Sequence, residues 1–411
     1  HMTNVYNLLI HIANFHLLVA QFFSKKLRLF VQGRKKTFSI ISEILTREER
    51  TIWFHCASLG EYEQGVPIME AYKKKYPDYK LVVSFFSPSG YEVKKNNTLA
   101  DVTVYLPMDT KSNARKFIKA INPVYVFFVK YEVWPNYLFE LEKQQIPAVL
   151  VSGVFREDQA YFKMYGGLMR KALKTFDHLF VQNIASEILL KSIELTDVTV
   201  SGDTRFDRVS HQIEMDNDLS FMETFKQDRL CIVCGSTWPE DDAVLIAYIN
   251  QSPENVIFVI APHKIDNSNI KALLDKIKKP TVRYSQMTDE SLTQATILIL
   301  DTVGLLTKIY SYADIAYVGG GMGTDGLHNI LEPATFGVPV VIGKNFDKFP
   351  EAERLQSLAG LFSVSSSEEC TTIMTKLVDD GHFRSKTGMI CEHWINSNTG
   401  ATNTIVSRIS L

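Results

Sequence analysis

Apolar residues in the first half of the chain cluster into short continuous runs, and amphipathic stretches separate these runs. Continuous apolar strands that alternate with helices are typical of a parallel sheet whose two faces are both covered. The pattern therefore predicts an α/β domain with strands at 51–58, 79–86, 101–107, 123–130, 146–153, 178–183 and 198–203.

A polar and charged stretch at 204–228 interrupts this pattern, and a second series of apolar runs follows it. Two α/β domains of similar build, joined near residue 205, are therefore expected. Ligands of open parallel sheets bind at the carboxyl ends of the strands, and with two such domains these ends can face each other across a cleft. The strands expected in the second domain are 229–236, 255–262, 295–301, 314–320, 339–344 and 361–366.

The segment at 5–36 has a different character, because it joins an apolar stretch to basic residues and contains no acidic residue. Asn and His residues interrupt the apolar part, so it is a poor fit to the ~20 apolar residues of a membrane-spanning helix. An apolar helix followed by a basic cluster is typical of a helix lying in an anionic membrane surface. The alternative is a helix that packs on its own protein and exposes a solvated basic end. The basic residues are Lys25, Lys26, Arg28, Arg34, Lys35 and Lys36.

Composition narrows the class of protein. With 411 residues, of which 45% are apolar and 22% charged, the chain is expected to be a soluble globular protein of two domains. The formal net charge of −2 argues against a nucleic-acid partner. Cys231 and Cys234 lie three apart in a strand-like run, so their side chains should face opposite ways and not share a metal. The sequence shows no His-rich or Cys-rich ligand cluster and no nucleophile elbow, so neither a metal nor a cofactor is expected.

The stretch WFHCASLGE (53–61) begins as a buried strand, breaks at Gly60 and delivers Glu61 to the start of a helix. A helix N-terminus favours an acid by about 0.3–1 kcal/mol, which is one explanation for this carboxylate. The other explanation is a general base, because the carboxyl end of a strand is where a ligand of the sheet would bind.

Three further stretches of the first domain end strands with polar residues. SFFSPSG (84–90) turns at a proline and supplies Ser87, Ser89 and Gly90. KYEVWPN (130–136) places Glu132 at a strand tip, where a buried carboxylate needs a partner; the alternative is that Glu132 caps the following helix. SGDTRFDR (201–208) closes the domain, and its Arg205 could meet a ligand phosphate or an acid of the other domain.

A glycine-rich stretch, YVGGGMGTDGLHNILEPATFGVPVVIG (317–343), is the strongest cluster in the second domain. Its glycines let the backbone approach a ligand closely. We expect a helix that starts near His328 or Asn329 and runs to Gly337, whose free N–H groups suit a phosphate. Glu332 would then lie one turn into the helix and could accept from ribose hydroxyls. The alternative is a glycine turn and a capped helix that bind no ligand.

Two other strand ends in the second domain offer ligand contacts. GSTWPEDD (235–242) opens a helix with Ser236 or Thr237 as its cap, and its acidic residues are expected to be solvated partners of the helix dipole rather than metal ligands. APHK (261–264) turns at Pro262, and its His263 and Lys264 could meet an anion or simply form a solvated surface turn.

Six motifs in these stretches, taken in order, resemble one family, the 3-deoxy-D-manno-oct-2-ulosonic acid (Kdo) transferases of lipopolysaccharide synthesis. The resemblance implies a GT-B glycosyltransferase fold with two Rossmann-like domains and a C-terminal helix that crosses back to the first domain. It also implies inverting transfer of Kdo from CMP-Kdo to a lipid A precursor (lipid IVA) on the cytoplasmic face of the inner membrane. The motifs are HCASLGE (55–61), SPSG (87–90), YEVWPN (131–136), SGDTRFD (201–207), GSTWPEDD (235–242) and HNILEPATFGVPV (328–340).

Residue by residue, the resemblance implies that Glu61 is the general base and that Glu132 matches the acid before W-P. Two positions depart from the family pattern: His263 stands where an arginine is usual, and Lys130 where a second acid is usual. The remaining acceptor-side candidates are His55, Ser58, Gly60, Ser87, Ser89 and Gly90. The donor-binding candidates are Arg205, Ser236, Thr237, Pro262, His263, Lys264, Gly320, Gly321, Met322, Gly323, Asn329 and Glu332.

The expected organisation has four parts. Residues 3–48 form a membrane-associating segment, 49–205 the acceptor domain, 206–385 the nucleotide-sugar domain and 386–411 the returning C-terminal helix. Two other functions remain open on the residues alone. One is a sugar-nucleotide epimerase of the same two-domain plan, and the other is a membrane-bound nucleotide-binding protein without catalytic activity.

Overall fold

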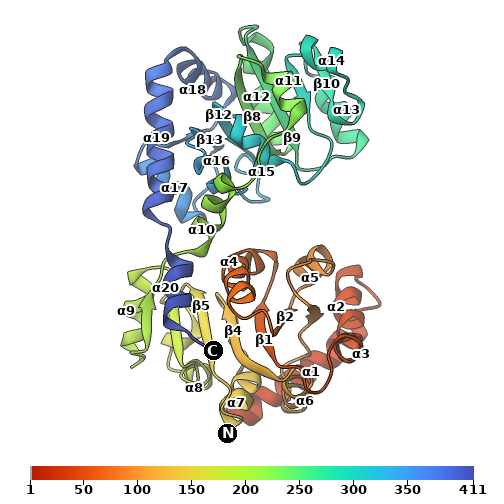
Figure 1. The fold of residues 1–411 in the computed structure, drawn as a ribbon, viewed down its shortest axis with the longest axis vertical. Coiled ribbons are helices and arrows are strands. Elements are labelled where there is room, and N and C mark those ends of the chain that lie inside the picture. Colours follow the sequence, from red (N-terminus) through yellow and green to blue (C-terminus); the bar gives the residue numbers. More distant parts are fainter. Residues whose placement is uncertain (1) are drawn as a thin grey trace. The chain divides into compact units, whose positions relative to one another are not determined.

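The computed structural model describes residues 2–411, which divide into two compact units (Figure 1). The first unit runs to Arg208 and includes Thr399–Leu411, and the second unit is Val209–Asn398. Each unit contains one seven-stranded, fully parallel sheet, so the predicted pair of α/β domains is confirmed. The divisions at 208/209 and 398/399 lie three and thirteen residues beyond the expected boundaries at 205/206 and 385/386.

The sheet of the first unit has the strand order β3-β2-β1-β4-β5-β6-β7. All seven apolar runs predicted from the sequence form these strands. Chain connections run outward in both directions from the β1–β4 pair, so this pair is the topological switch point of the sheet. The strands are β1 (Thr51–Cys56), β2 (Lys80–Phe85), β3 (Val102–Tyr105), β4 (Pro123–Val129), β5 (Ala148–Gly153), β6 (His178–Val181) and β7 (Val198–Val200).

Both faces of this sheet are buried, which explains the continuous apolar runs. Along β1, Trp53 packs into the cluster on one face, and Ile52 and Phe54 pack into the cluster on the other. The Trp53 face is covered by α3 (Thr37–Ile44), α6 (Lys111–Ile121), α7 (Pro135–Lys143), α8 (Gly167–Leu173) and α9 (Ile184–Ser192). The other face is covered by α4 (Leu59–Lys75) and α20 (Ala401–Arg408), while α5 (Pro88–Lys94) follows β2.

The sheet of the second unit has the order β10-β11-β9-β8-β12-β13-β14, with its switch point between β8 and β12. Six of its strands were predicted. The seventh, β10 (Thr281–Arg283), was missed because three residues with a single valine carry no apolar pattern. The others are β8 (Leu230–Thr237), β9 (Val256–Pro262), β11 (Ile297–Ile299), β12 (Ile315–Val318), β13 (Val340–Gly343) and β14 (Leu361–Val364).

Helices cover both faces of this sheet as well. One cluster joins the strands to α12 (Pro239–Gln251), α13 (Asn267–Leu274) and α18 (Ser367–Asp379). The other joins them to α11 (Ser220–Lys226), α14 (Asp289–Gln294) and α15 (Leu306–Ile309). Cys234 belongs to the first cluster and Cys231 to the second, which confirms that these two thiols face opposite ways. The remaining helices of the unit are α16 (Leu331–Ala334), α17 (Pro350–Ser357) and α19 (Gly381–Ser397).

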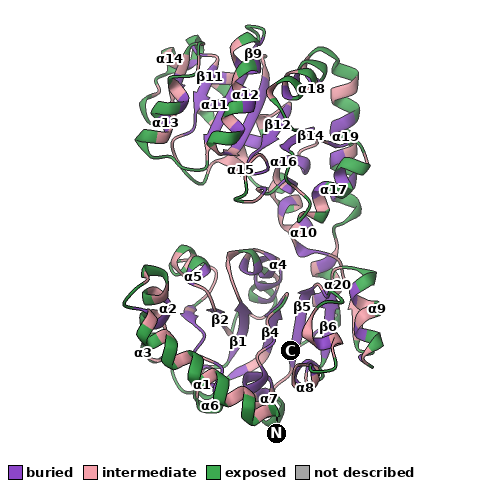
Figure 2. Cartoon of the chain, turned by 180° about the vertical axis from the view of Figure 1, so that it is seen from behind, coloured by how far each residue is buried: buried purple, intermediate pink, exposed green. Residues whose placement is uncertain are grey.

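The N-terminal helix α1 (Met2–Ala20) has no buried residue, and Figure 2 shows it largely exposed. Its attachment to the first unit includes two polar contacts: the Tyr6 hydroxyl donates to Asp109 (2.6 Å), and the Asn136 amide donates to Asn7 (2.8 Å). Burial raises the pKa of Asp109 to about 6. Among the described residues no single helix is long and apolar enough to cross a membrane, although α1 and α2 (Lys25–Lys35), which meet at a 117° bend, pass that test as a pair on length and composition.

Arg34 departs from the solvated basic cluster that the sequence predicted. Its guanidinium lies 3.5 Å from the ring centre of Phe30 and donates to the backbone carbonyl oxygen of Phe86 (2.6 Å). Burial lowers the pKa of Arg34 to about 9. The other five basic residues of the segment are exposed. Arg34 is therefore part of the packing between α2 and the first unit.

The C-terminal helix α20 is held in the first unit by Asp207, which lies in α10 (Thr204–His211). The Asp207 carboxylate accepts from the backbone N–H groups of Gly400 (2.7 Å) and Thr402 (2.8 Å), and from the Thr402 hydroxyl (2.8 Å). These are the donors that a helix start leaves without partners inside the helix. An acid in the S-G-D-T-R-F-D stretch thus anchors a helix almost two hundred residues away along the chain.

We predict that Asp207→Ala loosens α20, because it removes three hydrogen bonds from one charged group, which should cost about 1–3 kcal/mol. Amide hydrogen exchange of residues 400–408 should become faster, while the sheet of the first unit keeps its protection. Glu157→Ala, at an exposed position of the same unit, is the control. Unchanged exchange in α20 would contradict the anchoring role.

Candidate active site

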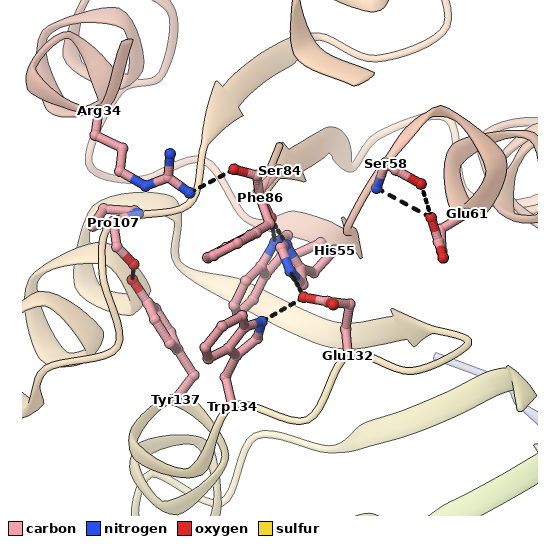
Figure 3. A network of polar contacts seen from close by, with 11 residues as sticks. Arg34, His55, Ser58, Glu61, Ser84, Phe86, Pro107, Glu132, Trp134 and Tyr137 are labelled. Atoms are coloured by element: carbon pink, nitrogen blue, oxygen red, sulfur yellow. Dashed lines mark hydrogen bonds and ion pairs between the residues drawn. The ribbon is translucent and has the colours of Figure 1, made fainter. Parts of the chain in front are cut away.

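The carboxyl ends of β1, β2 and β4 meet at the switch point of the first unit, and a polar network occupies this place (Figure 3). His55 on β1 is fully buried. Its Nδ1 lies 2.8 Å from the Ser84 hydroxyl on β2, and its Nε2 lies 2.8 Å from Glu132 Oε2 in the loop after β4. The sequence prediction named His55 and Glu132, and the structure brings them into direct contact.

The Glu132 carboxylate decides which nitrogen of His55 carries the proton. A carboxylate only accepts, so His55 Nε2–H donates to Glu132 and Nδ1 accepts from the Ser84 hydroxyl. The Trp53 indole donates to Ser84 Oγ (2.7 Å), which leaves the proton of that hydroxyl for His55. The opposite tautomer would set two lone pairs against each other at the His55–Glu132 contact. The Trp134 indole also donates to Glu132 Oε2 (2.5 Å), so this oxygen accepts two N–H bonds.

The loop that carries Glu132 is held from both sides. Lys130 turns the chain at the end of β4 with a φ of +66°, in the left-handed region that side chains seldom adopt. Trp134 stacks on Phe86 (ring centres 5.0 Å apart), and Phe86 is the residue whose carbonyl accepts from Arg34. Helix α2 is therefore connected to the Glu132 loop through one stacked ring pair.

Glu61 lies in the first turn of α4, where its Oε2 accepts from the backbone N–H of Ser58 (3.1 Å) and contacts the Ser58 hydroxyl. This is a capping arrangement, as the helix-start explanation expected. The same carboxylate also belongs to the end of β1. Burial raises the pKa of the Cys56 thiol, and the charges of Glu61 and Glu132 raise it further. Both acids therefore act on the last residue of the central strand.

The S-P-S-G stretch packs directly against this turn. A Cβ at Gly90 would lie 2.9 Å from the backbone carbon of Ser58, so only glycine allows α5 to approach so closely. The Ser87 and Ser89 hydroxyls are 2.8 Å apart. Gly60 is different, because a Cβ there would meet nothing closer than 3.9 Å. Close packing therefore does not explain why a glycine stands at position 60.

Arg205 has an acid partner within its own unit, beside the two partners that the sequence left open for it. Its Nε donates to Asp203 Oδ2 (2.9 Å), and its backbone N–H donates to Asp203 Oδ1 (2.9 Å). Asp203 is buried. The structure thus gives Arg205 a role in the chain turn that precedes α10.

In the second unit, a buried acid organises the switch point. Asp241 in the first turn of α12 is fully buried and accepts from the backbone N–H groups of Trp238 (2.8 Å) and Gly320 (3.0 Å) and from the Tyr317 hydroxyl (2.7 Å). The expectation that these helix-start acids are solvated is wrong for Asp241. The expected caps, Ser236 and Thr237, are also wrong, because β8 continues to Thr237 and Trp238 precedes the helix.

The glycine loop after β12 needs its glycines at the positions that touch backbone. A Cβ at Gly319 would lie 2.2 Å from the carbonyl oxygen of Ser236. Gly320 has a φ of +99°, and a Cβ there would lie 2.0 Å from the carbonyl oxygen of Gly326. The candidates Gly321, Met322 and Gly323 follow in the same loop. The Asn345 amide donates to the carbonyl of Gly323 (2.9 Å), and Met322 packs on the core.

The helix expected from 328 or 329 to Gly337 is shorter, because α16 spans only Leu331–Ala334. The Asn329 side chain accepts from the backbone N–H of Leu331 (2.9 Å), so it turns the chain before the helix begins. Gly337 closes this stretch with a φ of +71°. Glu332 lies in the single helical turn. Burial raises the pKa of the Tyr310 hydroxyl, and the charge of Glu332 raises it further. One turn provides much less dipole for a phosphate than the sequence suggested.

Aromatic and basic side chains gather where β8 and β9 end. His263, which follows Pro262, stacks on Trp238 with ring centres 4.4 Å apart, and the His328 ring lies 4.8 Å from that of His263. Lys264 Nζ lies 5.3 Å from the Trp238 ring. The sequence prediction named His263 and Lys264 but missed Trp238 and His328. The strand order could have indicated all four residues, because each one follows β8, β9 or β12, which are neighbours in the sheet.

The described residues 2–411 contain no group of three or more His, Cys, Asp or Glu side chains that could hold a metal ion. The two switch points therefore offer carboxylates, imidazoles, an indole and glycine-loop backbone groups. This chemistry fits proton transfer in the first unit and anion or nucleotide binding in the second.

Comparison with known proteins shows which proteins this chain resembles. A family model described as 3-deoxy-D-manno-octulosonic-acid transferase (kdotransferase) matches residues 32–208. The 3-deoxy-D-manno-octulosonic acid transferase of Haemophilus influenzae is 28% identical over 332 residues, which cover 77% of this chain and 76% of that protein. The chain is therefore similar to Kdo transferases over most of its length. It is a glycosyltransferase, as the resemblance of its motifs implied.

A bifunctional glycosyltransferase/methyltransferase of Fusobacterium nucleatum is also 28% identical, over 357 residues. The match covers 83% of this chain but only 53% of that longer protein. The similarity therefore spans about half the length of this relative.

Solved structures confirm the GT-B fold class. A UDP-GlcNAc 2-epimerase from Neisseria meningitidis has a TM-score of 0.62 at 14% identity, covering 87% of this chain and 98% of that one. MurG from Acinetobacter baumannii has a TM-score of 0.54 at 11% identity, covering 88% of this chain and 99% of that one. At such low identity the likeness shows the fold alone. The similarity to an epimerase therefore does not support epimerase activity in this chain.

We predict that Ser84→Ala destabilises the protein, because it leaves the Trp53 indole N–H and His55 Nδ1 without partners. Leaving buried polar groups unpaired costs about 1–3 kcal/mol. The midpoint of urea unfolding of the first unit, followed by tryptophan fluorescence, should fall accordingly. Ser87→Ala, whose hydroxyl contacts only Ser89 among the described residues, should change the midpoint little. Equal midpoints for both variants would contradict the proposed network.

Proposed function

We propose that this chain transfers Kdo from CMP-Kdo to a lipid A precursor, lipid IVA, with Glu61 as the general base. The observation that carries the proposal is the pair of carboxylates, Glu61 and Glu132, at the carboxyl end of β1, the switch-point strand of the first unit. Similarity to Kdo transferases supports the transferred sugar. CMP-Kdo, the acceptor and the base are our inference from the motifs and the site.

Transfer requires an acceptor hydroxyl to lose a proton while the donor sugar leaves its phosphate. A carboxylate within hydrogen-bond reach of that hydroxyl supplies about 10²–10⁴-fold in rate. Both recorded contacts of Glu61, to the N–H and the hydroxyl of Ser58, involve Oε2. Among the described residues Oε1 has no such partner, so it is the oxygen that we expect to receive the proton. The capping bonds would hold the carboxylate in position, so capping and catalysis are compatible roles.

Glu132 is suited to a different task. Its Oε2 accepts from His55 and Trp134, which fixes the side chain at a strand tip next to Ser84. We assign it to acceptor binding, where its other oxygen would accept from a sugar hydroxyl. In the second unit, the glycine loop, Asn329 and Glu332 would bind the nucleotide of the donor.

The N-terminal segment would bring the enzyme to its acceptor, which is an acylated disaccharide held in a membrane. Exposed apolar side chains follow one another along α1 at helical spacing, and they continue into the turn before α2. Exposed lysines and Arg28 on and after α2 could meet lipid phosphates. We therefore propose a peripheral location on the cytoplasmic face of the inner membrane. The exposed apolar residues are Val5, Leu8, Leu9, Ile12, Phe15, Leu18, Val19, Phe22 and Phe23.

We predict that Glu61→Gln abolishes transfer without unfolding the protein. The amide keeps an oxygen for the cap but is a very weak base, so kcat should fall about 10²–10⁴-fold. The assay mixes enzyme, CMP-Kdo and a tetra-acylated lipid A precursor and measures the product by mass. Glu70→Gln, at an exposed position of the same helix, is the control and should be fully active.

Each outcome of this assay has a distinct meaning. Loss of transfer only in Glu61→Gln supports the base. Equal transfer by Glu61→Gln and the wild type would show that the base is elsewhere and that Glu61 only caps α4. If the folded wild type adds no Kdo, the donor or acceptor assignment is wrong.

We predict that Leu8→Asp with Phe15→Asp weakens membrane binding, because both side chains are largely exposed on α1 and would no longer enter the interface. Sedimentation with vesicles of phosphatidylethanolamine and phosphatidylglycerol should pellet the wild type and not the variant. The control, Ile184→Asp with Ile188→Asp, changes two equally exposed apolar residues of α9. Equal binding by both variants would contradict the role of α1.

A further inference from the structure

Two histidine rings and one indole form a compact group at the switch point of the second unit. The His263 and Trp238 rings are close to parallel, with an angle of 19° between their planes, and His328 completes the group beside His263. The Trp238 indole donates to His328 Nε2 (3.3 Å). His328 also abuts the glycine loop, since a Cβ at Gly320 would lie 3.1 Å from its ring. The group therefore lies where the donor is expected to bind.

The charges around these rings favour their neutral forms. His263 is exposed but packs one ring face on Trp238, and this partial desolvation lowers its pKa; Lys264 lowers it further, and Asp325 opposes both. Burial also lowers the pKa of His328, with a further decrease from His263 and an increase from Asp241. The Asp241 carboxylate is already engaged by three donors. Since an ordinary histidine has a pKa near 6.5, both rings are neutral at pH 7.5 in the free protein.

A bound phosphate would favour the charged form of one of these two imidazole rings. An anion within a few ångströms favours the charged form of a histidine. The face of an indole also attracts a cation, and His263 already stacks on Trp238. His328 is less suited to take the proton. Its Nε2 accepts from the Trp238 indole, and a proton on Nε2 would break that hydrogen bond. His263 is exposed, so a ligand can reach it.

We propose that His263, backed by Trp238 and His328, binds the phosphate of the nucleotide donor as an imidazolium, so that donor binding takes up a proton. This inference rests on the proposed function and assigns a protonation step to its donor site. The ligand class is a nucleoside monophosphate, and CMP is the probe. Lys264, whose charge does not change near neutral pH, would add attraction that does not depend on pH.

The sign of the pH dependence follows from linkage. Phosphate binding raises the pKa of His263 from below 6.5, so CMP binds more tightly as the pH falls towards 6.5 and more weakly as it rises to 8. One proton taken up gives a change of at most about tenfold in affinity per pH unit. The second ionisation of a phosphate monoester lies near pH 6, so measurements at pH 6.5 and above limit its own contribution.

The experiment is calorimetric titration of CMP into the full chain at pH 6.5 and 8.0, in two buffers of different ionisation enthalpy. The wild type should bind CMP at least about fivefold more tightly at pH 6.5, with proton uptake visible as a buffer-dependent heat. His263→Arg carries a permanent charge, so it should bind at pH 8.0 as tightly as the wild type does at pH 6.5, without proton uptake. His263→Gln should bind weakly at both values, and cytidine, which lacks the phosphate, should show no such pH dependence.

Two results would overturn this inference while leaving the proposed function intact. One is an unchanged pH dependence and proton uptake in His263→Arg. The other is loss of the dependence in His328→Gln alone, which would place the proton on the wrong ring. Failure of the folded wild type to bind CMP at either pH would instead contradict the donor assignment itself, and this inference with it.

Discussion

The full burial of His55 inside a parallel sheet is the constraint on which the first unit's site depends. A buried imidazole needs partners for both nitrogen atoms, and here Ser84 and Glu132 supply them from two neighbouring strands. Because the Glu132 carboxylate only accepts, His55 donates to it and accepts from Ser84, which in turn accepts from Trp53. Packing of the core thereby determines the position of Glu132, and the stacked pair Phe86–Trp134 links this position to α2.

The second unit uses the same topology with a different buried group. Asp241 replaces the imidazole as the centre of the network, and its three donors tie the start of α12 to β12 and to the glycine loop. In both units a buried polar side chain bonds to a loop at the strand ends, where the sheet order reverses. One site then presents carboxylates, and the other presents imidazoles and backbone groups. Glycosyl transfer requires a base for the acceptor and a binding site for an anionic leaving group, and these two sets of groups suit those requirements.

The sequence predicted the architecture well because strands buried on both faces must be apolar along their whole length. Every strand of the first sheet followed from this rule, and β10 escaped it because its three residues include only one apolar side chain. Glu61, Glu132 and the glycine loop were found because each follows a strand. Asp241 and Arg34 were misjudged for the opposite reason, since charge in a sequence suggests solvent, and only the folded structure shows the three donors of Asp241 or the aromatic rings around Arg34. The helix at α16 was predicted too long, because the turn made by the Asn329 side chain replaces the first turn of the expected helix.

The central claim is that a residue which caps α4 also takes the proton of the acceptor. The most direct test is an experimental structure of the enzyme with CMP and a soluble disaccharide acceptor. The account predicts an acceptor hydroxyl within about 3.2 Å of Glu61 Oε1, while Oε2 keeps its bond to Ser58. A structure in which that hydroxyl instead lies against Glu132, with Glu61 bonded only to its own helix start, would contradict the account.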